Sequence, residues 1–251
     1  MTAYALFVVL IEVYSKRQKR GQVPITGLIR RFVKSVFTIG LKKTVILTYL
    51  QIHDFLYDFR FRIKTAEKIR EPELGYKGTD CVGYGPYWYR NIYKIFNSIQ
   101  PITEKDVFLD YGCGKGRVIV VASTYPFQKV LGVELSTDLC AIASENINRS
   151  QKNLVCKNIQ VVNVDATYYS PPEDVTHFFF YNPFGNDILS NVFDAIHVSL
   201  VKNPRDITVI YTPPGGNPQT ILDDCSWLRK RGEYLISPRI HNQVVRIYSN
   251  K

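Results

Sequence analysis

The residues best suited to chemistry lie in one short stretch, Val107–Val118, which reads VFLDYGCGKGRV. An apolar, strand-like run leads into Asp110, and glycines follow at Gly112, Gly114 and Gly116. Glycines at this spacing allow positive φ angles and let a ligand approach the backbone more closely than a Cβ atom would permit. The stretch therefore predicts a strand, a tight ligand-binding turn and the start of a helix.

The same stretch argues against the two common phosphate-binding loops. A dinucleotide-binding turn needs a glycine where this chain has Arg117, and Lys115 does not stand in the frame of a phosphate-loop lysine. Asp110 adds a charge argument, because a carboxylate repels a pyrophosphate and attracts an ammonium or a sulfonium. The order D-x-G-x-G-x-G thus favours a nucleoside that carries an amino acid, and a glycine turn without a ligand is the alternative.

Two further acids follow apolar, strand-like runs. Val130–Val133 predicts a second strand that ends in Glu134, where a carboxylate can accept hydrogen bonds from both hydroxyls of a ribose. Ile159–Val164 predicts a third strand, and Asp165 follows it directly. A single acid at a strand end is often a turn residue. Three acids at the ends of successive strands indicate one shared site.

The glycine turn resembles motif I of the class I S-adenosylmethionine-dependent methyltransferases, and residues 101–251 resemble that domain over nearly their whole length. The turn D-x-G-C-G-K-G-R, the second strand G-V-E-L-S and the fourth strand Y-N-P-F-G are similar to a bacterial group of this family, in which a basic helical extension often precedes the domain. The resemblance implies an α/β fold: a doubly wound, mostly parallel seven-stranded sheet with a terminal antiparallel strand. It also implies S-adenosylmethionine as the cofactor.

The resemblance assigns the remaining parts of the cofactor to residues of this chain. Asp110 would hold the amino group, directly or through water, while Gly112 and Gly114 would admit the cofactor's backbone. An acid after the third strand holds the adenine amino group in this family, which places Asp165 there. The backbone amide of Ala166 would reach a ring nitrogen.

The predicted fourth strand, Thr176–Tyr181, ends in Asn182, Pro183 and Phe184. The carboxyl edge of a parallel sheet is where an acceptor would lie beside the cofactor. The order N-P-F resembles the (Asn/Asp)-Pro-Pro-(Phe/Tyr) motif of methyltransferases that modify amino nitrogens, with one proline missing. By this resemblance Asn182 and a proline carbonyl would accept hydrogen bonds from the amine and the ring of Phe184 would pack on it; an ordinary Asn-Pro turn is the alternative.

A loop rich in glycine and aromatic residues, Glu71–Tyr89, precedes the first predicted strand. A helix is expected from about Pro86 to Ile99, because proline suits a first helical turn. The loop could fold over the cofactor, with Tyr84 as the candidate cofactor-facing side chain. The alternative is a structural connector whose aromatic rings pack in the core.

The rest of the chain alternates helix and strand, as a doubly wound sheet requires. Ser136 is expected to cap the helix that follows the second strand. The further expected elements are a helix at Ile188–Val201, a strand at Ile207–Tyr211, a helix at Gln219–Arg229, and an antiparallel pair at Tyr234–Ile236 and Val244–Tyr248.

Charge divides the chain near residue 70. Residues 1–70 carry 14 Lys/Arg and 4 Asp/Glu, a balance of +10 that equals the net charge of the whole chain, whereas residues 71–251 carry 18 of each. We therefore expect a basic helical extension at 1–70, a connecting loop and helix at 71–100 that could cap the cofactor, and the methyltransferase domain at 101–251.

The extension contains three apolar stretches. Ala3–Tyr14 would span only about 18 Å as a helix, against a hydrocarbon core of about 30 Å, and it lacks the pattern of a signal peptide. From Leu28 onward a basic amphipathic helix is expected, and Val45–Phe59 predicts another helix after a break at Gly40. Three interpretations stay open: a helical cap on the catalytic body, adsorption to an anionic membrane surface, and nucleic-acid binding, which no recognised motif supports.

The five cysteines are odd in number and scattered, and the four histidines show no metal-ligand spacing, so neither a disulfide framework nor a metal site is expected. This pattern predicts a cytoplasmic protein, which could be peripheral to a membrane. Two other functions remain to be tested beside methyl transfer to an unknown acceptor, with an amino nitrogen such as that of a protein lysine favoured. They are a non-catalytic, membrane-associated binding protein and an NAD(P)-dependent oxidoreductase.

Overall fold

The computed structural model describes residues 25–75, 83–181, 184–213, 221–236 and 243–251. The chain divides into two compact units, Met1–Tyr57 and Asp58–Lys251. This boundary lies earlier than the one near residue 70 that the charge balance predicts. Residues 58–70, although rich in basic side chains, are folded into the second unit.

The first unit is helical in its described part. It contains α2, Ile25–Ile39, and most of α3, Leu41–Phe61. Gly40 lies between them with a φ of 83°, in the left-handed region that favours glycine, so the predicted break is confirmed. Among the described helices, none is both long enough and apolar enough to cross a membrane.

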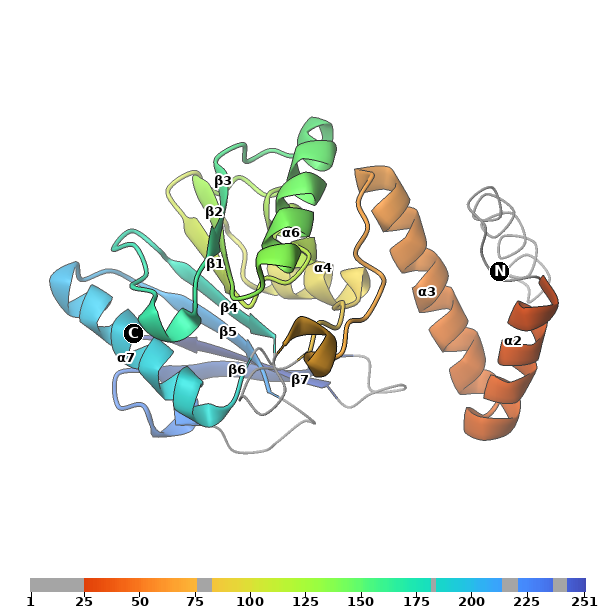
Figure 1. Cartoon of the computed structure of the whole chain (residues 1–251). Coiled ribbons are helices and arrows are strands. Elements are labelled where there is room, and N and C mark those ends of the chain that lie inside the picture. Colours follow the sequence, from red (N-terminus) through yellow and green to blue (C-terminus); the bar gives the residue numbers. More distant parts are fainter. Residues whose placement is uncertain (1–24, 76–82, 182–183, 214–220, 237–242) are drawn as a thin grey trace. The chain divides into compact units, whose positions relative to one another are not determined.

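The second unit is built on a mixed sheet with the strand order β3-β2-β1-β4-β5-β7-β6 (Figure 1). The first five strands are parallel, and β7 runs antiparallel to both β5 and β6. Their bounds are β1 Val107–Tyr111, β2 Lys129–Glu134, β3 Ile159–Asn163, β4 His177–Tyr181, β5 Thr208–Thr212, β6 Arg229–Ile236 and β7 Gln243–Ser249. The predicted fold class, a mostly parallel seven-stranded sheet ending in antiparallel strands, is confirmed.

Helices cover both faces of the sheet. α4 (Tyr89–Ser98), α5 (Arg117–Ala122) and α6 (Thr137–Ser150) lie on one face, and α7 (Asn186–Lys202) lies on the other (Figure 1). Alternate residues of each strand point to opposite faces of the sheet. Phe108 of β1 points to the α4 face, where its ring packs near that of Phe96 in α4. Short 3-10 helices lie at η1 Glu71–Leu74, η2 Gln151–Asn153, η3 Ala166–Tyr168 and η5 Ile221–Asp224.

The strand order reverses between β1 and β4. The chain runs from β1 outward to β3 on one side and from β4 outward to β5 on the other. Ligands of such sheets bind in the crevice at the carboxyl ends of the strands, at this switch point. The glycine turn after β1 and the end of β4 therefore lie at the same edge of the sheet.

The end of the chain departs from the prediction in one element. The helix expected at Gln219–Arg229 is wrong for its described part, which holds only η5 before β6 begins at Arg229. The apolar residues Leu222 and Leu228 are buried in the core on the α7 side. From Arg229 onward the backbone forms β6, which pairs with β7. Tertiary pairing thus overrides a helix-like spacing of apolar residues.

Candidate functional site

The turn after β1 has the backbone that its glycines predict. Gly112, Gly114 and Gly116 have φ angles of 76°, 54° and 78°. The N–H of Gly112 donates to the carbonyl oxygen of Val133 at 2.9 Å, which ties the turn to the end of β2. A Cβ atom at position 114 would lie 2.4 Å from Cδ2 of Tyr84. Glycine is needed there both for the backbone angle and for the close approach of that ring.

Asp110 is a buried acid at the end of β1. Its side chain is 3% exposed and makes no hydrogen bond or ion pair with the residues that the structure describes. Burial raises the pKa of Asp110 well above its usual range, and the nearby carboxylate of Glu134 raises it further. A buried carboxyl group of this kind is costly unless a donor or a cation meets it, so the position suits a ligand's ammonium group.

Glu134, the last residue of β2, joins two turns. Its Oε2 accepts the N–H of Gly114 at 2.9 Å, and its Oε1 accepts the N–H of Ser136 at 2.9 Å. Ser136 in turn caps α6 by accepting the N–H of Leu139, as predicted. These two hydrogen bonds fix the orientation of the carboxylate at the end of β2.

The third predicted acid lies next to the end of β2. The N–H of Val164 donates to the carbonyl oxygen of Glu134 at 3.1 Å, which brings the turn after β3 beside Glu134. Asp165 accepts the N–H of Thr167 at 2.8 Å and so caps η3, and Ala166 is buried. The structure therefore gathers Asp110, Glu134 and Asp165 at one edge of the sheet.

The predicted acceptor residues are described in part. Asn182 and Pro183 lie outside the described residues, and Phe184 is half-buried against the core on the α7 side. Tyr181, at the end of β4, stacks on Tyr87 with ring centroids 4.0 Å apart. Its hydroxyl accepts a hydrogen bond from Gln243 Nε2 at 3.1 Å. The strand end that leads into Asn182 is thus held by an aromatic stack and a hydrogen bond.

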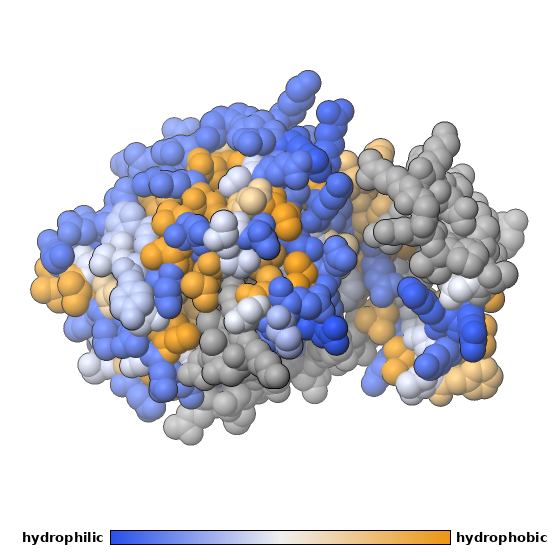
Figure 2. Space-filling view, in the orientation of Figure 1, coloured by the Kyte–Doolittle hydropathy of each residue, from blue (hydrophilic) through white to orange (hydrophobic). Residues whose placement is uncertain are grey.

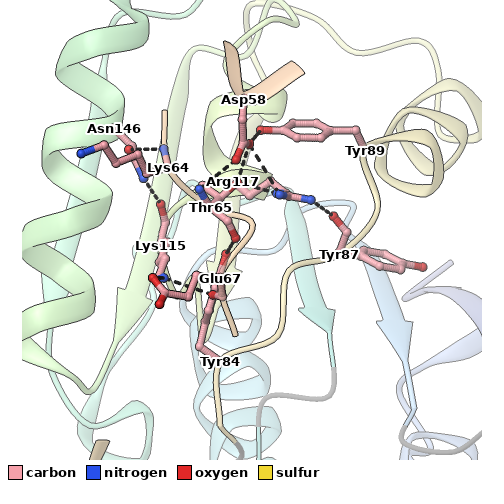
Figure 3. Close-up of polar contacts among 10 residues, drawn as sticks. All are labelled: Asp58, Lys64, Thr65, Glu67, Tyr84, Tyr87, Tyr89, Lys115, Arg117 and Asn146. Carbon is pink, nitrogen blue, oxygen red and sulfur yellow. Dashed lines mark hydrogen bonds and ion pairs between the residues drawn. The ribbon is translucent and has the colours of Figure 1, made fainter. Parts of the chain in front are cut away.

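Residues before the sheet lie beside the glycine turn (Figure 3), and those from 58 to 70 were expected to belong to the basic extension instead. We call the described part of residues 58–87 the strap. Arg117, 2% exposed, donates from Nε to Thr65 Oγ1 at 2.7 Å and from Nη1 to the carbonyl oxygen of Tyr87 at 2.9 Å. Its Nη2 lies 3.5 Å from Asp58 Oδ1, and its guanidinium carbon lies 4.3 Å from the ring centroid of Tyr89. Arg117 therefore anchors the strap to the start of α5.

Lys115 makes a second anchor. Its Nζ donates to the carbonyl oxygen of Glu67 at 3.1 Å and lies 5.0 Å from the ring centroid of Tyr84. Burial lowers the pKa of Lys115, while the carboxylate of Glu67 acts in the opposite sense. Asn146 of α6 donates to the carbonyl oxygen of Lys115 at 2.9 Å and accepts the N–H of Lys64 at 3.0 Å. Both basic side chains of the turn are engaged by the strap.

Tyr84 is placed by these contacts. Its hydroxyl donates to the carbonyl oxygen of Thr65 at 2.8 Å, and its carbonyl oxygen accepts the N–H of Ile69 at 3.0 Å. The ring lies against Gly114. That the loop folds over the cofactor, with Tyr84 facing it, stays a prediction. One signal in the sequence could have revealed the strap. Lys115 and Arg117 lie in a turn between apolar runs, where their side chains are buried, and buried cations need partners.

Comparison of the sequence with known proteins gives two matches. A family model described as "Putative methyltransferase" matches residues 104–184. An uncharacterized protein of Rickettsia prowazekii (strain Madrid E) is 29% identical over 164 residues, which are 64% of this chain and 64% of that protein. The chain thus spans less than two thirds of the length of this curated relative.

Two solved structures share the fold. A conserved hypothetical protein from Streptococcus pyogenes is 15% identical, with a TM-score of 0.50 over 63% of this chain and 94% of that one. An Escherichia coli protein described as a "putative methyltransferase" is 17% identical, with a TM-score of 0.50 over 73% of this chain and 98% of that one. At these identities the likeness concerns the arrangement of the sheet and its helices.

Proposed function

We propose that the protein is an S-adenosylmethionine-dependent methyltransferase. The observation that carries the proposal is the carboxyl group of Asp110, buried at the glycine turn with no partner among the described residues. The match to the methyltransferase model, residues 104–184, covers this turn and extends from β1 through the end of β4. The turn, the acids and the family match support the same cofactor.

The residues around the turn fit each part of that cofactor. Asp110 offers a negative group for its ammonium, directly or through water, and the turn at Gly112 and Gly114 admits its amino-acid portion. Glu134 is oriented by two backbone N–H groups at the end of β2, and its carboxylate would accept hydrogen bonds from the ribose hydroxyls. Asp165 and the N–H of Ala166 would hold the adenine.

When bound, S-adenosylmethionine supplies an activated methyl carbon, so this chain's task is to position the acceptor. Asn182 and Pro183 would accept hydrogen bonds from an acceptor nitrogen, and Phe184 would pack against it. An amino nitrogen is favoured because the order Y-N-P-F at the end of β4 is similar to that of amino methyltransferases. The stack of Tyr181 on Tyr87 supports the proposal by holding the strand end that carries Asn182.

The first test is calorimetric titration of the full chain with S-adenosylmethionine and, separately, with NADH. We expect micromolar binding of the first ligand and none of the second. Asp110→Asn should weaken S-adenosylmethionine binding by about 10- to 100-fold, since a hydrogen bond to a charged group contributes about 1.5–3 kcal/mol. Asn182→Ala should leave that affinity unchanged and abolish methyl transfer once an acceptor is found.

Asp174→Asn is the matched control, because Asp174 is an exposed acid in the turn before β4, away from the glycine turn. Its affinity for S-adenosylmethionine should equal that of the unmodified protein. Binding of NADH alone would replace the proposal with an oxidoreductase. Unchanged S-adenosylmethionine affinity in Asp110→Asn would remove Asp110 from the site.

A further inference from the structure

The outer side of α2 carries a row of exposed apolar side chains. Ile29, Val33 and Phe37 follow one another at the i, i+4, i+8 spacing that places residues on one face of a helix. They are 43%, 45% and 87% exposed, and Leu41 at the start of α3 is 61% exposed. Figure 2 shows hydrophobic residues of the first unit at the surface beside strongly hydrophilic ones.

A basic row runs next to the apolar one. Arg30 and Lys34, each one position after a member of the apolar row, are exposed, and so is Arg31. Lys42 and Lys43 add two exposed charges at the start of α3, and α2 contains no acidic residue. The face therefore combines a strip of apolar side chains with an unbalanced strip of positive charge.

A neighbouring side of α2 is directed to α3. Ser35 and Val36 are half-buried, and Thr44 Oγ1 donates to Ser35 Oγ at 3.2 Å. Val36 lies three residues after Val33, so the side that meets α3 adjoins the apolar row. Packing between the two helices leaves Ile29, Val33 and Phe37 exposed, together with the basic row.

We propose that α2 adsorbs to the surface of an anionic lipid bilayer, lying in the plane of the interface. Ile29, Val33 and Phe37 insert at the boundary between headgroups and acyl chains, while Arg30 and Lys34 meet lipid phosphates. The charge pattern favours this partner, because an apolar strip flanked by cations complements an anionic bilayer, whose headgroups are negative and whose acyl chains are apolar. A nucleic acid would use the cations and could stack a base on Phe37, but it would leave Ile29 and Val33 without an apolar partner.

The test is co-sedimentation of the full chain with phosphatidylcholine vesicles, with and without phosphatidylserine. Binding is expected to the phosphatidylserine vesicles and to fall as salt rises, because salt screens the attraction. Phe37→Ser should weaken the binding through lost apolar contact. Arg30→Gln combined with Lys34→Gln should lower the affinity by roughly 25-fold, since each basic residue near such a surface contributes about 5-fold.

Matched controls remove the same chemistry elsewhere. Phe59→Ser deletes another exposed phenylalanine, and the pair Lys105→Gln and Lys202→Gln deletes two exposed charges of the second unit. All of the substituted residues are exposed, so circular dichroism should show every variant folded, and the controls should bind vesicles as the unmodified chain does.

Equal binding to both kinds of vesicle, or full binding by the α2 variants, would overturn the proposal. So would the absence of vesicle binding together with lower melting temperatures of the α2 variants, which would show that the apolar row packs against protein. Binding of single-stranded RNA that is lost in the charge variant, without vesicle binding, would assign the basic row to nucleic acid instead. None of these outcomes depends on whether the second unit transfers methyl groups.

Discussion

At the residue scale, the side chain of Asp110 links ligand binding to proton binding. Its pKa in the folded protein is raised well above the ordinary value of 3.8, first by burial and then by Glu134. At a pH between the unfolded and the folded pKa, the folded state therefore holds a proton that the unfolded state releases. The stability that this group contributes is fully present below about pH 4 and is lost as pH rises through the folded pKa.

This linkage predicts the behaviour of Asp110→Asn without ligand. The amide cannot ionise, so the variant should lack the loss of stability that the unmodified protein shows as pH rises above about 4. Melting temperatures measured from pH 4 to about pH 8 should decline less steeply in the variant. Asp174→Asn serves as the control and should follow the unmodified protein. Parallel pH profiles for all three proteins would show that folding does not raise the pKa of Asp110.

At the element scale, the strap makes residues before the sheet part of the site. Arg117 reaches Asp58, Thr65 and the backbone of Tyr87 from the first residue of α5. The same strap carries Tyr84, which lies on Gly114, and Tyr87, which stacks on Tyr181. One segment thus touches both the predicted cofactor turn and the strand end that leads to the predicted acceptor residues.

Thr65→Val tests this coupling with little change of shape. Thr65 Oγ1 donates to Asp58 Oδ1 at 2.6 Å and accepts from Arg117, and both partners would lose a hydrogen bond. The free energy of unfolding should fall by about 1–3 kcal/mol. The affinity for S-adenosylmethionine should fall as well, because the strap positions Tyr84. Chemical denaturation and calorimetry give the two values.

Thr38→Val is the control for that substitution. Its hydroxyl donates to Lys34 O on the exposed surface of α2, so little stability should be lost. If Thr65→Val unfolds more easily and yet binds S-adenosylmethionine with unchanged affinity, the strap supports the fold alone.

At the scale of the whole molecule, the boundary between the two units decides which truncated chain can fold and bind the cofactor. The second unit begins at Asp58 and contains every contact described between the strap and the glycine turn. A boundary at residue 70 would remove Asp58, Thr65 and Glu67. The buried side chain of Arg117 would then lose Asp58 and Thr65, and that of Lys115 would lose Glu67. Removing one partner of a buried ion pair costs about 3–5 kcal/mol.

We therefore predict different outcomes for two truncated chains. Residues 58–251 should unfold in one cooperative transition and bind S-adenosylmethionine as the full chain does. Residues 71–251 should be unstable and should not bind it. Circular dichroism melts and calorimetry check both statements, and a stable, ligand-binding chain that starts at Glu71 would show the strap to be dispensable.

Local signals explain why the central sheet was predictable. Apolar runs that end in Asp110, Glu134 and Asp165 predict buried parallel strands. The glycines after Asp110 predict a turn with positive φ angles. Both patterns depend only on residues that are neighbours in the sequence. The expected helix at Gln219–Arg229 failed because β6 is stabilised by β7, whose residues follow later in the chain. Boundaries and pairings of this kind depend on contacts between distant residues.

The sequence by itself determined the doubly wound sheet, the glycine turn and the three acids at its edge, since these arise from short periodic patterns. Only the tertiary structure decided that Lys115 and Arg117 hold the strap, that Asp58 opens the second unit, and that Asp110 is buried without a described partner. The physical reason is that the burial of a charge and the identity of its partner depend on residues far away along the chain. No local pattern around Arg117 specifies Asp58 or Thr65.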